Sequence, residues 1–533
     1  MNTYGIRTSI TVRNTRIASL IAVGTVATFL LALTPATAPA PSGSEASVAK
    51  DPLRQYTQQT PRWQRCDAKN PATYQCATLK VPLNYGNSGG KKTDIAISRI
   101  KASSAKERRG VLLLNPGGPG GPGLDLPVSG AADFPEEVKR RYDLVGFDPR
   151  GVGQSSPVSC GLTGDEQDME RPYKTETFAK DVQWARTVAA KCQAKEGDRL
   201  RHLTTRNTAR DMDVIRAVLG EKKISYMGFS YGTYLGAVYA RMFPRRTDRF
   251  VLDSAVDPAR YGRGMFQAMG ERAEPAFTRW SEWTARRHTT YELGHTPAEV
   301  RKTFWDLVAQ VDRTPIDHGG TLLTGDTIRA QRATFSRVQK AATWVAELKK
   351  AAEGKKAAES KKAAEGRKPD PSGASEQVPG SLRQASARDV PPDNETASAW
   401  AVLCADTRTS WPRDPEQYRR DAIRDKDRYP LSGDFESNIK PCAFWKPGSE
   451  PRTTVTNKVR ALILQNEWDP ATPLAGGQAM HRALRGSRMV TVAGGEGHIV
   501  NGTNSCADNS ATVYLTTGRL PVKDLTCRAP SQS

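Results

Sequence analysis

The chain has 533 residues, of which 38% are hydrophobic and 25% charged, and its formal net charge is +21. This composition is typical of a water-soluble globular protein and excludes a disordered chain. The length allows one large domain with an insertion, or two to three smaller domains. No aromatic-interleaved basic motif accompanies the positive charge, so we expect no nucleic-acid partner. The charge instead favours solubility, or weak attraction to an anionic cell envelope.

The N-terminus has the order of a secretory signal peptide. An almost wholly apolar stretch at 17–33 is followed by small residues at 36–40. The basic lead before it contains Arg7, Arg13 and Arg16. We assign residues 1–40 to this signal, although nearby prolines would hinder cleavage there and favour a cut near Ala46. The alternative is an uncleaved anchor. We therefore expect a secreted, extracellular protein with no membrane span after signal removal.

The cysteines all follow the signal and fall into four local couples. They are Cys66, Cys76, Cys160, Cys192, Cys404, Cys442, Cys506 and Cys527. An even number in an exported chain points to disulfides, and pairing between neighbours is the simplest of the 105 arrangements that eight cysteines allow. No C-x-x-C motif is present and the histidines lie elsewhere, so we expect no metal site.

Short apolar runs alternate with polar stretches of helical length. Such alternation predicts a mostly parallel sheet covered by helices, the α/β class. Residues 41–60 before the first run are polar and predict a loose leader. The runs are Ala77–Val81, Ile95–Ile100, Val111–Leu114, Tyr142–Phe147, Ile224–Phe229, Phe250–Leu252, Val459–Leu464 and Met489–Val492. We therefore expect an eight-stranded sheet.

The series of strands is interrupted at 258–395. This stretch has helical patterning, for example in 276–283 and 300–311, and predicts an inserted helical cap. A repeat of the form KKAAEG begins at Lys349 and favours a solvated helix, followed by a Pro/Gly/Ser-rich linker. The repeat is either a tolerated surface insertion or a functional basic arm. The core is then divided into an N-terminal part, 41–257, and a C-terminal part, 396–533.

A nucleophile motif lies directly after one of these runs. Gly228-Phe229-Ser230-Tyr231-Gly232 matches G-x-S-x-G, and the residues that follow, to Phe243, predict a helix. The motif requires a sharp strand-to-helix turn that holds the serine above the sheet, and flanking glycines relieve the crowding at that turn. Strand, motif and helix together predict the α/β-hydrolase fold, with Ser230 as nucleophile.

A serine hydroxyl needs a base, and in this fold the chain order is serine, acid, histidine. His498 follows the last apolar run, where the fold places its base. Asp469 follows the preceding run within a rigid Asp-Pro-Ala-Thr-Pro turn, and we prefer it as the acid. Asp253 is the alternative acid and Glu467 a minor competitor. The alternative for Asp253 and Asp148 is a structural role, in which their carboxylates cap helices or brace loops at strand ends.

Acyl transfer also needs donors for the developing oxyanion. One is expected from the backbone N–H of Tyr231. The other should come from the glycine-rich loop that begins at Gly117 and Gly118. Phosphate binding by this loop is the rival hypothesis. The G-x-x-x-x-G-K-[ST] motif is absent and the loop's prolines remove N–H donors, so the oxyanion role is favoured.

Four motifs together carry a resemblance. They are Asn115-Pro116-Gly117-Gly118-Pro119-Gly120, Gly146-Phe147-Asp148-Pro149-Arg150-Gly151-Val152-Gly153, Gly228-Phe229-Ser230-Tyr231-Gly232-Thr233-Tyr234-Leu235-Gly236 and Glu467-Trp468-Asp469-Pro470-Ala471-Thr472-Pro473. From about residue 60 onward the chain resembles the secreted tripeptidyl aminopeptidases of Streptomyces-type actinobacteria, in the prolyl-aminopeptidase group. The lysine-rich repeat departs from that pattern.

The resemblance implies a serine exopeptidase that removes short peptides, chiefly tripeptides, from free N-termini of peptides and proteins. It implies the triad Ser230, Asp469 and His498, with no metal and no cofactor. Such an enzyme must recognise the substrate's ammonium group, and Glu271 and Glu274 are candidates by position only, an ordinary helix-surface role being the alternative. A secreted esterase or small-molecule amidase is the alternative function. A non-catalytic binding protein is disfavoured by the intact serine, acid and histidine.

Overall fold

A computed structural model describes residues 51–129, 134–364, 390–407 and 410–529, with side chains in the lysine-rich helix described up to Lys355. The expected signal peptide and the linker that follows the lysine-rich repeat lie outside these residues. Within the described part of the chain, no helix combines the length and the apolar character needed to cross a membrane.

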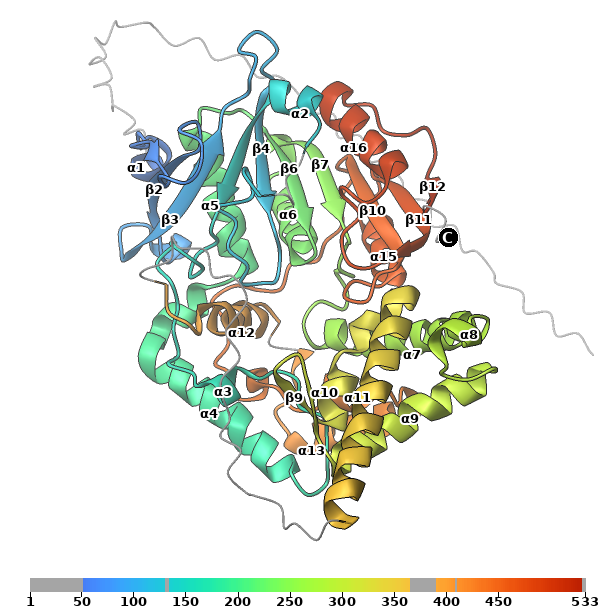
Figure 1. The fold of residues 1–533 in the computed structure, drawn as a ribbon. Coiled ribbons are helices and arrows are strands. Elements are labelled where there is room, and N and C mark those ends of the chain that lie inside the picture. The colour runs from blue at the N-terminus through green and yellow to red at the C-terminus, as the bar shows by residue number, and fades with distance from the viewer. Residues whose placement is uncertain (1–50, 130–133, 365–389, 408–409, 530–533) are drawn as a thin grey trace, which may run out of the picture. The chain divides into compact units, whose positions relative to one another are not determined.

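Ten strands of the described residues form one sheet in the order β1-β2-β3-β5-β4-β6-β7-β10-β11-β12. Every pair from β5 onward is parallel, whereas β1, β2 and β3 pair antiparallel at one edge (Figure 1). The strands are β1 Gln64–Arg65, β2 Gln75–Pro82, β3 Lys92–Ile100, β4 Gly110–Asn115, β5 Tyr142–Phe147, β6 Ile224–Phe229, β7 Thr247–Asp253, β10 Ala461–Trp468, β11 Arg488–Glu496 and β12 Leu525–Arg528. Each of the eight apolar runs forms or overlaps one strand, and two short edge strands extend the sheet.

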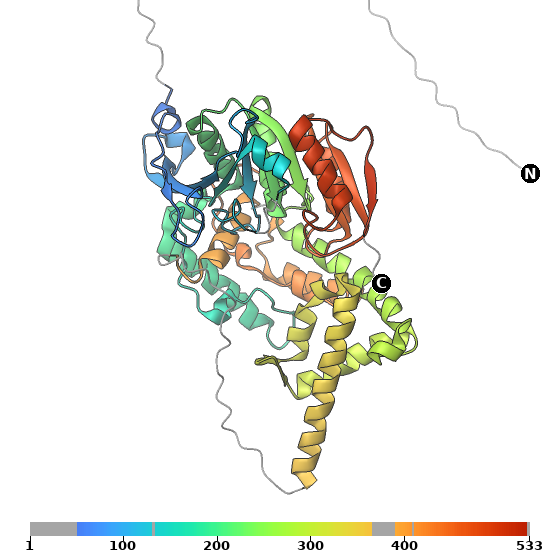
Figure 2. The same cartoon turned by 45° about the horizontal axis from the view of Figure 1, so that its top comes forward.

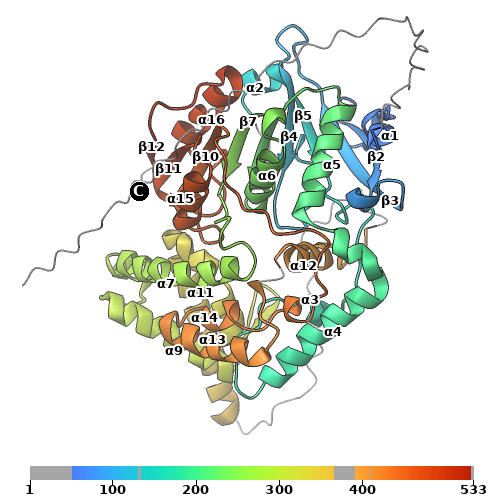
Figure 3. The same cartoon turned by 180° about the vertical axis from the view of Figure 1, so that it is seen from behind.

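The central strands of the sheet are buried on both faces. Along β4, Val111 and Leu113 face one apolar core while Leu112 and Leu114 face the other, because successive strand residues point to opposite sides. Helices α5 and α6 cover one face (Figure 3), and α2 and α16 cover the other. The helices on and beside the sheet are α1 Arg54–Thr57, α2 Glu136–Arg141, α5 Thr205–Val218, α6 Tyr231–Met242, α15 Leu474–Ala483 and α16 Ser505–Thr517. Helices α3 Gly164–Gln167 and α4 Phe178–Glu196 lie beyond the end of the sheet (Figure 3).

A second helical layer lies at the end of the sheet where the parallel strands finish (Figure 1). It has an apolar core of its own, which includes Phe277, Trp280, Phe304 and Phe335. Its elements are α7 Arg263–Ala285, α8 His288–Tyr291, α9 Pro297–Arg313, β8 Ile316–His318, β9 Thr321–Leu323, α10 Gly325–Ala330, the 3₁₀ turn η5 Arg332–Ser336, α11 Val338–Ala364, α12 Asn394–Asp406, α13 Pro415–Arg428 and α14 Gly433–Glu436. The lysine-rich repeat continues α11 as a helix that extends away from the sheet (Figure 2).

All eight cysteines form disulfides between sequence neighbours: Cys66–Cys76, Cys160–Cys192, Cys404–Cys442 and Cys506–Cys527. This is the pairing expected from their spacing. The leader is less loose than expected, because residues 54–57 form the helical turn α1 and Tyr56 is buried. The Tyr56 hydroxyl donates to the carbonyl of Ser88 at 2.5 Å, which fastens this segment to the edge of the sheet.

Candidate active site

Ser230 occupies a strained turn between β6 and α6. Its φ is 55° and its ψ −124°, a combination that non-glycine residues rarely adopt. The backbone N–H of Ser230 donates to the carbonyl of Asp253 at 3.0 Å. The carbonyl of Ser230 accepts the N–H of Thr233 at 2.9 Å. These bonds hold the serine at the top of the sheet, half-buried, at the N-terminus of a helix.

The glycines on either side of Ser230 are required by space. A Cβ on Gly228 would lie 2.5 Å from the Tyr226 ring, and one on Gly232 would lie 2.8 Å from Oδ1 of Asn115. Real Cβ atoms do not approach other heavy atoms so closely, so both positions accept only glycine without rearrangement. Since Asn115 ends β4, the turn is packed directly against the start of the glycine-rich loop.

Gly117 in that loop lies against the serine turn. A Cβ on it would lie 2.4 Å from the Phe229 carbonyl and 3.0 Å from both Cβ of Ser230 and the N of Tyr231. The Gly117 N–H donates to Oδ1 of Asn115 at 3.2 Å. The loop therefore brings the backbone after Gly117 next to the Tyr231 N–H, which is where a tetrahedral oxyanion needs two donors.

Asp148 holds the far end of this loop. Its buried carboxylate accepts the N–H groups of Gly123 at 2.8 Å, Leu124 at 3.1 Å and Gln154 at 2.7 Å. Burial raises the pKa of Asp148 to about 6, although these three hydrogen bonds favour its charged form. The carboxylate thus braces the loop, in line with the structural role considered for it.

His498 and Asp469 form a close pair. Nδ1 of His498 lies 2.9 Å from Oδ2 and 3.0 Å from Oδ1 of Asp469. The Asp469 carboxylate is completely buried, whereas 28% of the His498 side chain is exposed. Backbone N–H groups of Ala471 and Thr472, each at 2.9 Å, fix the carboxylate. The imidazole therefore presents Nδ1 to the acid and leaves Nε2 for another partner.

The pKa of His498 is raised above the ordinary histidine value. Burial acts to lower it, but the hydrogen bond to Asp469 and the negative charges of Asp469 and Asp253 outweigh that effect. A histidine of this kind accepts a proton readily near neutral pH, which suits a general base.

Two further residues position the loop that carries His498. The buried carboxylate of Asp253 accepts the N–H groups of Val500 at 2.9 Å and Asn501 at 2.7 Å. The side-chain amide of Asn466 donates to the carbonyls of Gly497 and Ile499, each at 3.1 Å. Asp253 therefore binds backbone N–H groups of the loop, while Asp469 binds the imidazole itself. Asn466 was not expected from the sequence, which carries no local signal for its role.

Glu467, the minor competitor for the acid, and His481, a second histidine in the C-terminal part, have other partners. Glu467 accepts the N–H of Gly494 at 2.6 Å. The ring of His481, on α15, lies 2.7 Å from the Ser487 hydroxyl and 3.1 Å from Asp524. Neither side chain is bonded to the imidazole of His498. In the described residues, no group of three or more histidine, cysteine, aspartate or glutamate side chains could hold a metal ion.

A buried polar chain lies behind the serine turn. The hydroxyls of Tyr231 and Thr205 are 2.6 Å apart, and Thr205 donates its N–H to Asp406 at 2.8 Å and its hydroxyl to the same carboxylate. Burial raises the pKa of Asp406 to about 7, although bonds from Thr205 oppose the shift. Asp406 is 201 residues from Thr205, so local sequence gave no sign of this contact.

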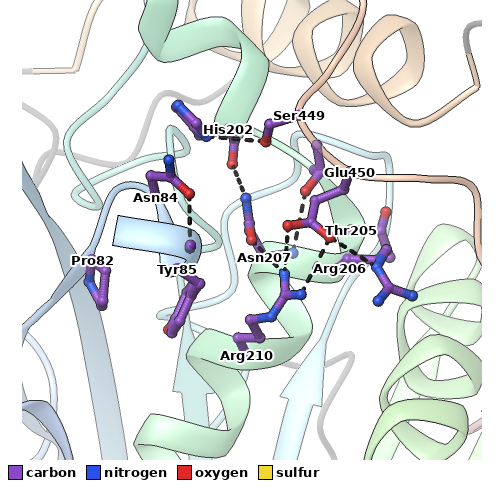
Figure 4. A network of polar contacts seen from close by, with 12 residues as sticks. Pro82, Asn84, Tyr85, His202, Thr205, Arg206, Asn207, Arg210, Ser449 and Glu450 are labelled. Carbon is purple, nitrogen blue, oxygen red and sulfur yellow. Dashed lines mark hydrogen bonds and ion pairs between the residues drawn. The ribbon is translucent and has the colours of Figure 1, made fainter. Parts of the chain in front are cut away.

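The start of α5, which carries Thr205, is itself anchored by a polar network (Figure 4). Arg206 and Arg210 both reach the carboxylate of Glu450, at 3.0 and 2.9 Å. Ring nitrogen Nδ1 of His202 lies 3.0 Å from the hydroxyl of Ser449. The network fastens the segment before β10 to α5 and so fixes the helix end behind Tyr231.

Two cavities lie between α7 and the turn that follows Asp469. One, of about 190 Å³, is lined by Ala471, Thr472 and Glu271, and the other, of about 140 Å³, by Ala471, Trp468 and Glu436. Both touch the acid-bearing turn, so they offer space for a substrate side chain or N-terminus beside it.

The two glutamates chosen by position differ in their surroundings. Glu271 lines the larger cavity and is paired with Arg260 through two 2.7 Å bonds. Glu274 accepts the N–H of Leu431 at 2.6 Å and does not line either cavity. The sequence did not single out Glu170 and Glu436, which line the smaller cavity and both pair with Arg332.

A mostly parallel sheet, a serine at a strand-to-helix turn and a buried acid bonded to a histidine define a serine hydrolase of the α/β-hydrolase class. The family model of the alpha/beta hydrolase fold matches residues 110–287. A second model, described as TAP-like protein, matches residues 429–527, the part that contains Asp469 and His498.

Relatives identify the family within that class. A tripeptidyl aminopeptidase from Streptomyces lividans is 35% identical over 486 residues, 87% of this chain and 86% of that protein. Serine protease Hip1 from Mycobacterium tuberculosis is 28% identical over 91% of this chain and 93% of its own length. Carboxylesterase B from the same species is 28% identical over 87% and 89%. The chain belongs to the tripeptidyl aminopeptidase family.

Proposed function

We propose that the protein is a secreted serine exopeptidase that releases tripeptides from the free N-termini of peptides and proteins. The observation that carries the proposal is the His498–Asp469 pair, joined through Asp253 to the turn that holds Ser230. The similarity to tripeptidyl aminopeptidases over most of both chains supports the same reading.

The chemistry follows from the roles of these groups. The Ser230 hydroxyl attacks the scissile carbonyl and gives its proton to Nε2 of His498, while Asp469 holds the other side of the ring and stabilises its charged form. The N–H of Tyr231 and one from the glycine loop bind the oxyanion. Because the Gly117 N–H is donated to Asn115, Gly118 is the better second donor.

Collapse of the intermediate breaks the C–N bond. His498 gives its proton to the leaving amine, and an acyl-enzyme on Ser230 remains. Water then adds to the ester carbonyl with His498 as base, and the peptide is released with a free carboxylate while Ser230 regains its proton. No step needs a metal or a cofactor.

Secretion is part of the proposal. It is supported by the residue pattern at 1–40 and by the four disulfides, which persist in oxidising surroundings. We likewise propose the division into a hydrolase core, 41–257 and 396–533, and an inserted cap, 258–395, although α12, α13 and α14 of the C-terminal part lie in the same helical layer as the cap (Figure 1). The separate apolar core of α7 to α11 supports this division.

The main test is a panel of mono-, di- and tripeptidyl chromogenic amides together with simple esters. The parent should turn over the tripeptidyl amide with the highest kcat/KM. Ser230→Ala should lower that activity by at least about 10⁴-fold and abolish labelling by a fluorophosphonate probe, because only an activated serine reacts. Near-normal turnover by a folded Ser230→Ala protein would refute the assignment.

The same panel tests an alternative function. Similarity to carboxylesterase B supports an esterase on the same scaffold. A kcat/KM for simple esters well above that for every peptidyl amide would favour the esterase.

We propose Glu271 and Glu274 as candidates for recognition of the substrate ammonium, of which Glu271 is the better placed because it lines a cavity beside the acid turn. Glu271→Gln and Glu274→Gln should be compared on free and N-acetylated tripeptidyl amides. A variant with the parent's preference for the free amine carries no such role. Glu436→Gln makes the same change in the smaller cavity and is compared on the same substrates.

A further inference from the structure

An open groove of about 930 Å³ lies in the helical layer, between α11 and the hairpin formed by β8 and β9. Its size is within the range of ligand-binding clefts. The side chains from α11 recur at helical spacing and so share one face. They are Gln339, Lys340, Thr343, Trp344 and Glu347.

The groove begins at the loop that carries His498. Glu496, two residues before His498, forms part of its lining and is paired with Arg279 at 2.6 Å. Arg337 lies against Gly497, since a Cβ on that glycine would be 2.5 Å from the Arg337 guanidinium. The inner end of the groove is therefore in direct contact with the residues that precede the candidate base.

We propose that this groove binds the part of a peptide substrate that lies C-terminal to the scissile bond. The inference rests on the proposed function. His498 returns its proton to the leaving amine, so the leaving chain must begin beside His498. Glu496 lines the groove, and Arg337, which also lines it, lies against Gly497, so the groove offers a space that continues from that point.

The turn η5 separates this groove from the smaller cavity near Asp469. Gln331 and Thr334 line the groove, whereas Arg332, Ala333 and Ser336 line the cavity. The two sides of the scissile bond thus have separate places: the cavities on the acid side for the N-terminal peptide, and the groove on the histidine side for the leaving chain.

The lining suits an extended peptide of varied sequence. Hydroxyl and amide side chains such as Thr343 and Gln331 can bond backbone groups of any residue, and half-buried Trp344 offers an apolar surface. From Val338 to Glu347 the helix advances about 14 Å, which matches about four residues of extended chain.

The inner half of the groove is basic. Glu496 is paired with Arg279, so Arg337 and Lys340 set the charge there, and Glu347 lies further along the helix. Complementary charge favours acidic side chains in the first positions after the scissile bond. The groove therefore selects among leaving chains, whereas the cavities select among N-terminal peptides.

The test compares a tripeptidyl p-nitroanilide with two heptapeptides that begin with the same three residues and carry Glu or Lys as the second residue after the scissile bond. The parent should prefer the Glu heptapeptide. Lys340→Glu should lower the ratio of kcat/KM for the Glu heptapeptide to that for the anilide by about fivefold or more, mainly through KM. Trp344→Ala should lower the ratio for both heptapeptides.

Lys302→Glu is the matched control, because it makes the same charge change on α9, at an exposed residue outside the groove that pairs with Asp306. It should leave the ratio unchanged. If Lys340→Glu and Trp344→Ala both keep the parent's ratio and still hydrolyse the anilide, the groove proposal is overturned but the proposed function is not. A parent that hydrolyses neither the anilide nor the heptapeptides overturns the proposed function.

Discussion

The carboxylate of Asp253 accepts the backbone N–H of Val500 at 2.9 Å, two residues beyond His498. The backbone carbonyl of the same aspartate accepts the N–H of Ser230 at 3.0 Å. A single buried residue at the end of β7 therefore joins the serine turn to the histidine loop. In the proposed mechanism, the distance between nucleophile and base therefore depends on a residue that contributes no atom to the reaction.

Asp253→Asn should consequently lower kcat without removing the nucleophile. The amide can accept only one of the two N–H groups that the carboxylate binds, and its own N–H₂ would face the other donor. We expect a fall in kcat of about 10- to 100-fold with a smaller change in KM, measured on a tripeptidyl anilide. A variant of parental kcat and parental Tm would show that these bonds do not position His498.

The fall of activity on the acidic side of the pH profile, the acid limb, reflects the protonation of His498. Its raised pKa means that the base becomes protonated, and activity falls, as pH drops through a value above the ordinary 6.5. Asp469→Asn removes the hydrogen bond and the charge that raise the pKa and leaves the burial that lowers it. The acid limb should therefore move to lower pH, while kcat falls by about 10⁴-fold.

The measurement is kcat/KM against pH for parent and variant. His481→Gln is the control, since His481 is bonded to Ser487 and Asp524 and should leave the limb in place. An acid limb that moves with His481 rather than with Asp469 would contradict the assignment of the base.

Gly117→Ala tests the packing of the glycine loop against the serine turn. The new Cβ would meet the Phe229 carbonyl at 2.4 Å and the Tyr231 nitrogen at 3.0 Å, so the oxyanion donors must separate. Loss of one such donor costs about 10²-fold in kcat, and we expect a fall of that size.

Gly220→Ala separates this effect from backbone strain. Gly220 has a similar positive φ, 75° against 97°, but a Cβ there would meet nothing within 4 Å. Both variants should lose about 1 kcal/mol of stability from the unfavourable φ. Only Gly117→Ala should lose activity, and equal kcat values in the two would argue against an oxyanion role for the loop.

The central strands β4, β5, β6, β7 and β10 were predictable because each is a short apolar run buried on both faces, as Leu112 and Leu113 illustrate. The serine turn was predictable because its glycines are demanded by local sterics. His498 and Asp469 were predictable from chain order and the rigid Asp-Pro turn. In the structure their side chains lie within hydrogen-bond distance of each other.

Residues that act across long sequence separations were not predictable. Asn466 bonds the histidine loop, and Arg337 contacts Gly497 from 160 residues away, yet neither stands in a motif. The roles of Glu271 and Glu274 could not be separated either, since both lie on α7 and only the folded cap shows which lines a cavity. Tertiary packing, rather than local propensity, decides such positions.

Asp406 offers the last prediction, on stability rather than activity. Its pKa is raised by burial to about 7 in the folded protein, above the value of about 3.9 in an unfolded chain. The folded state therefore holds this proton more tightly than the unfolded state between those values. The stability that the protonated carboxyl contributes is complete at low pH and is lost as pH rises towards 7.

Asp406→Asn keeps the shape of the side chain and removes the titration. The Tm of the variant minus that of the parent should therefore become more positive by about 2 °C or more between pH 5 and pH 8. Asp427→Asn, at an exposed site on α13, should show no such trend. A constant difference for Asp406→Asn would mean that the carboxyl is charged throughout this range. The network behind Tyr231 would then rest on an ion rather than on a proton shared with Thr205.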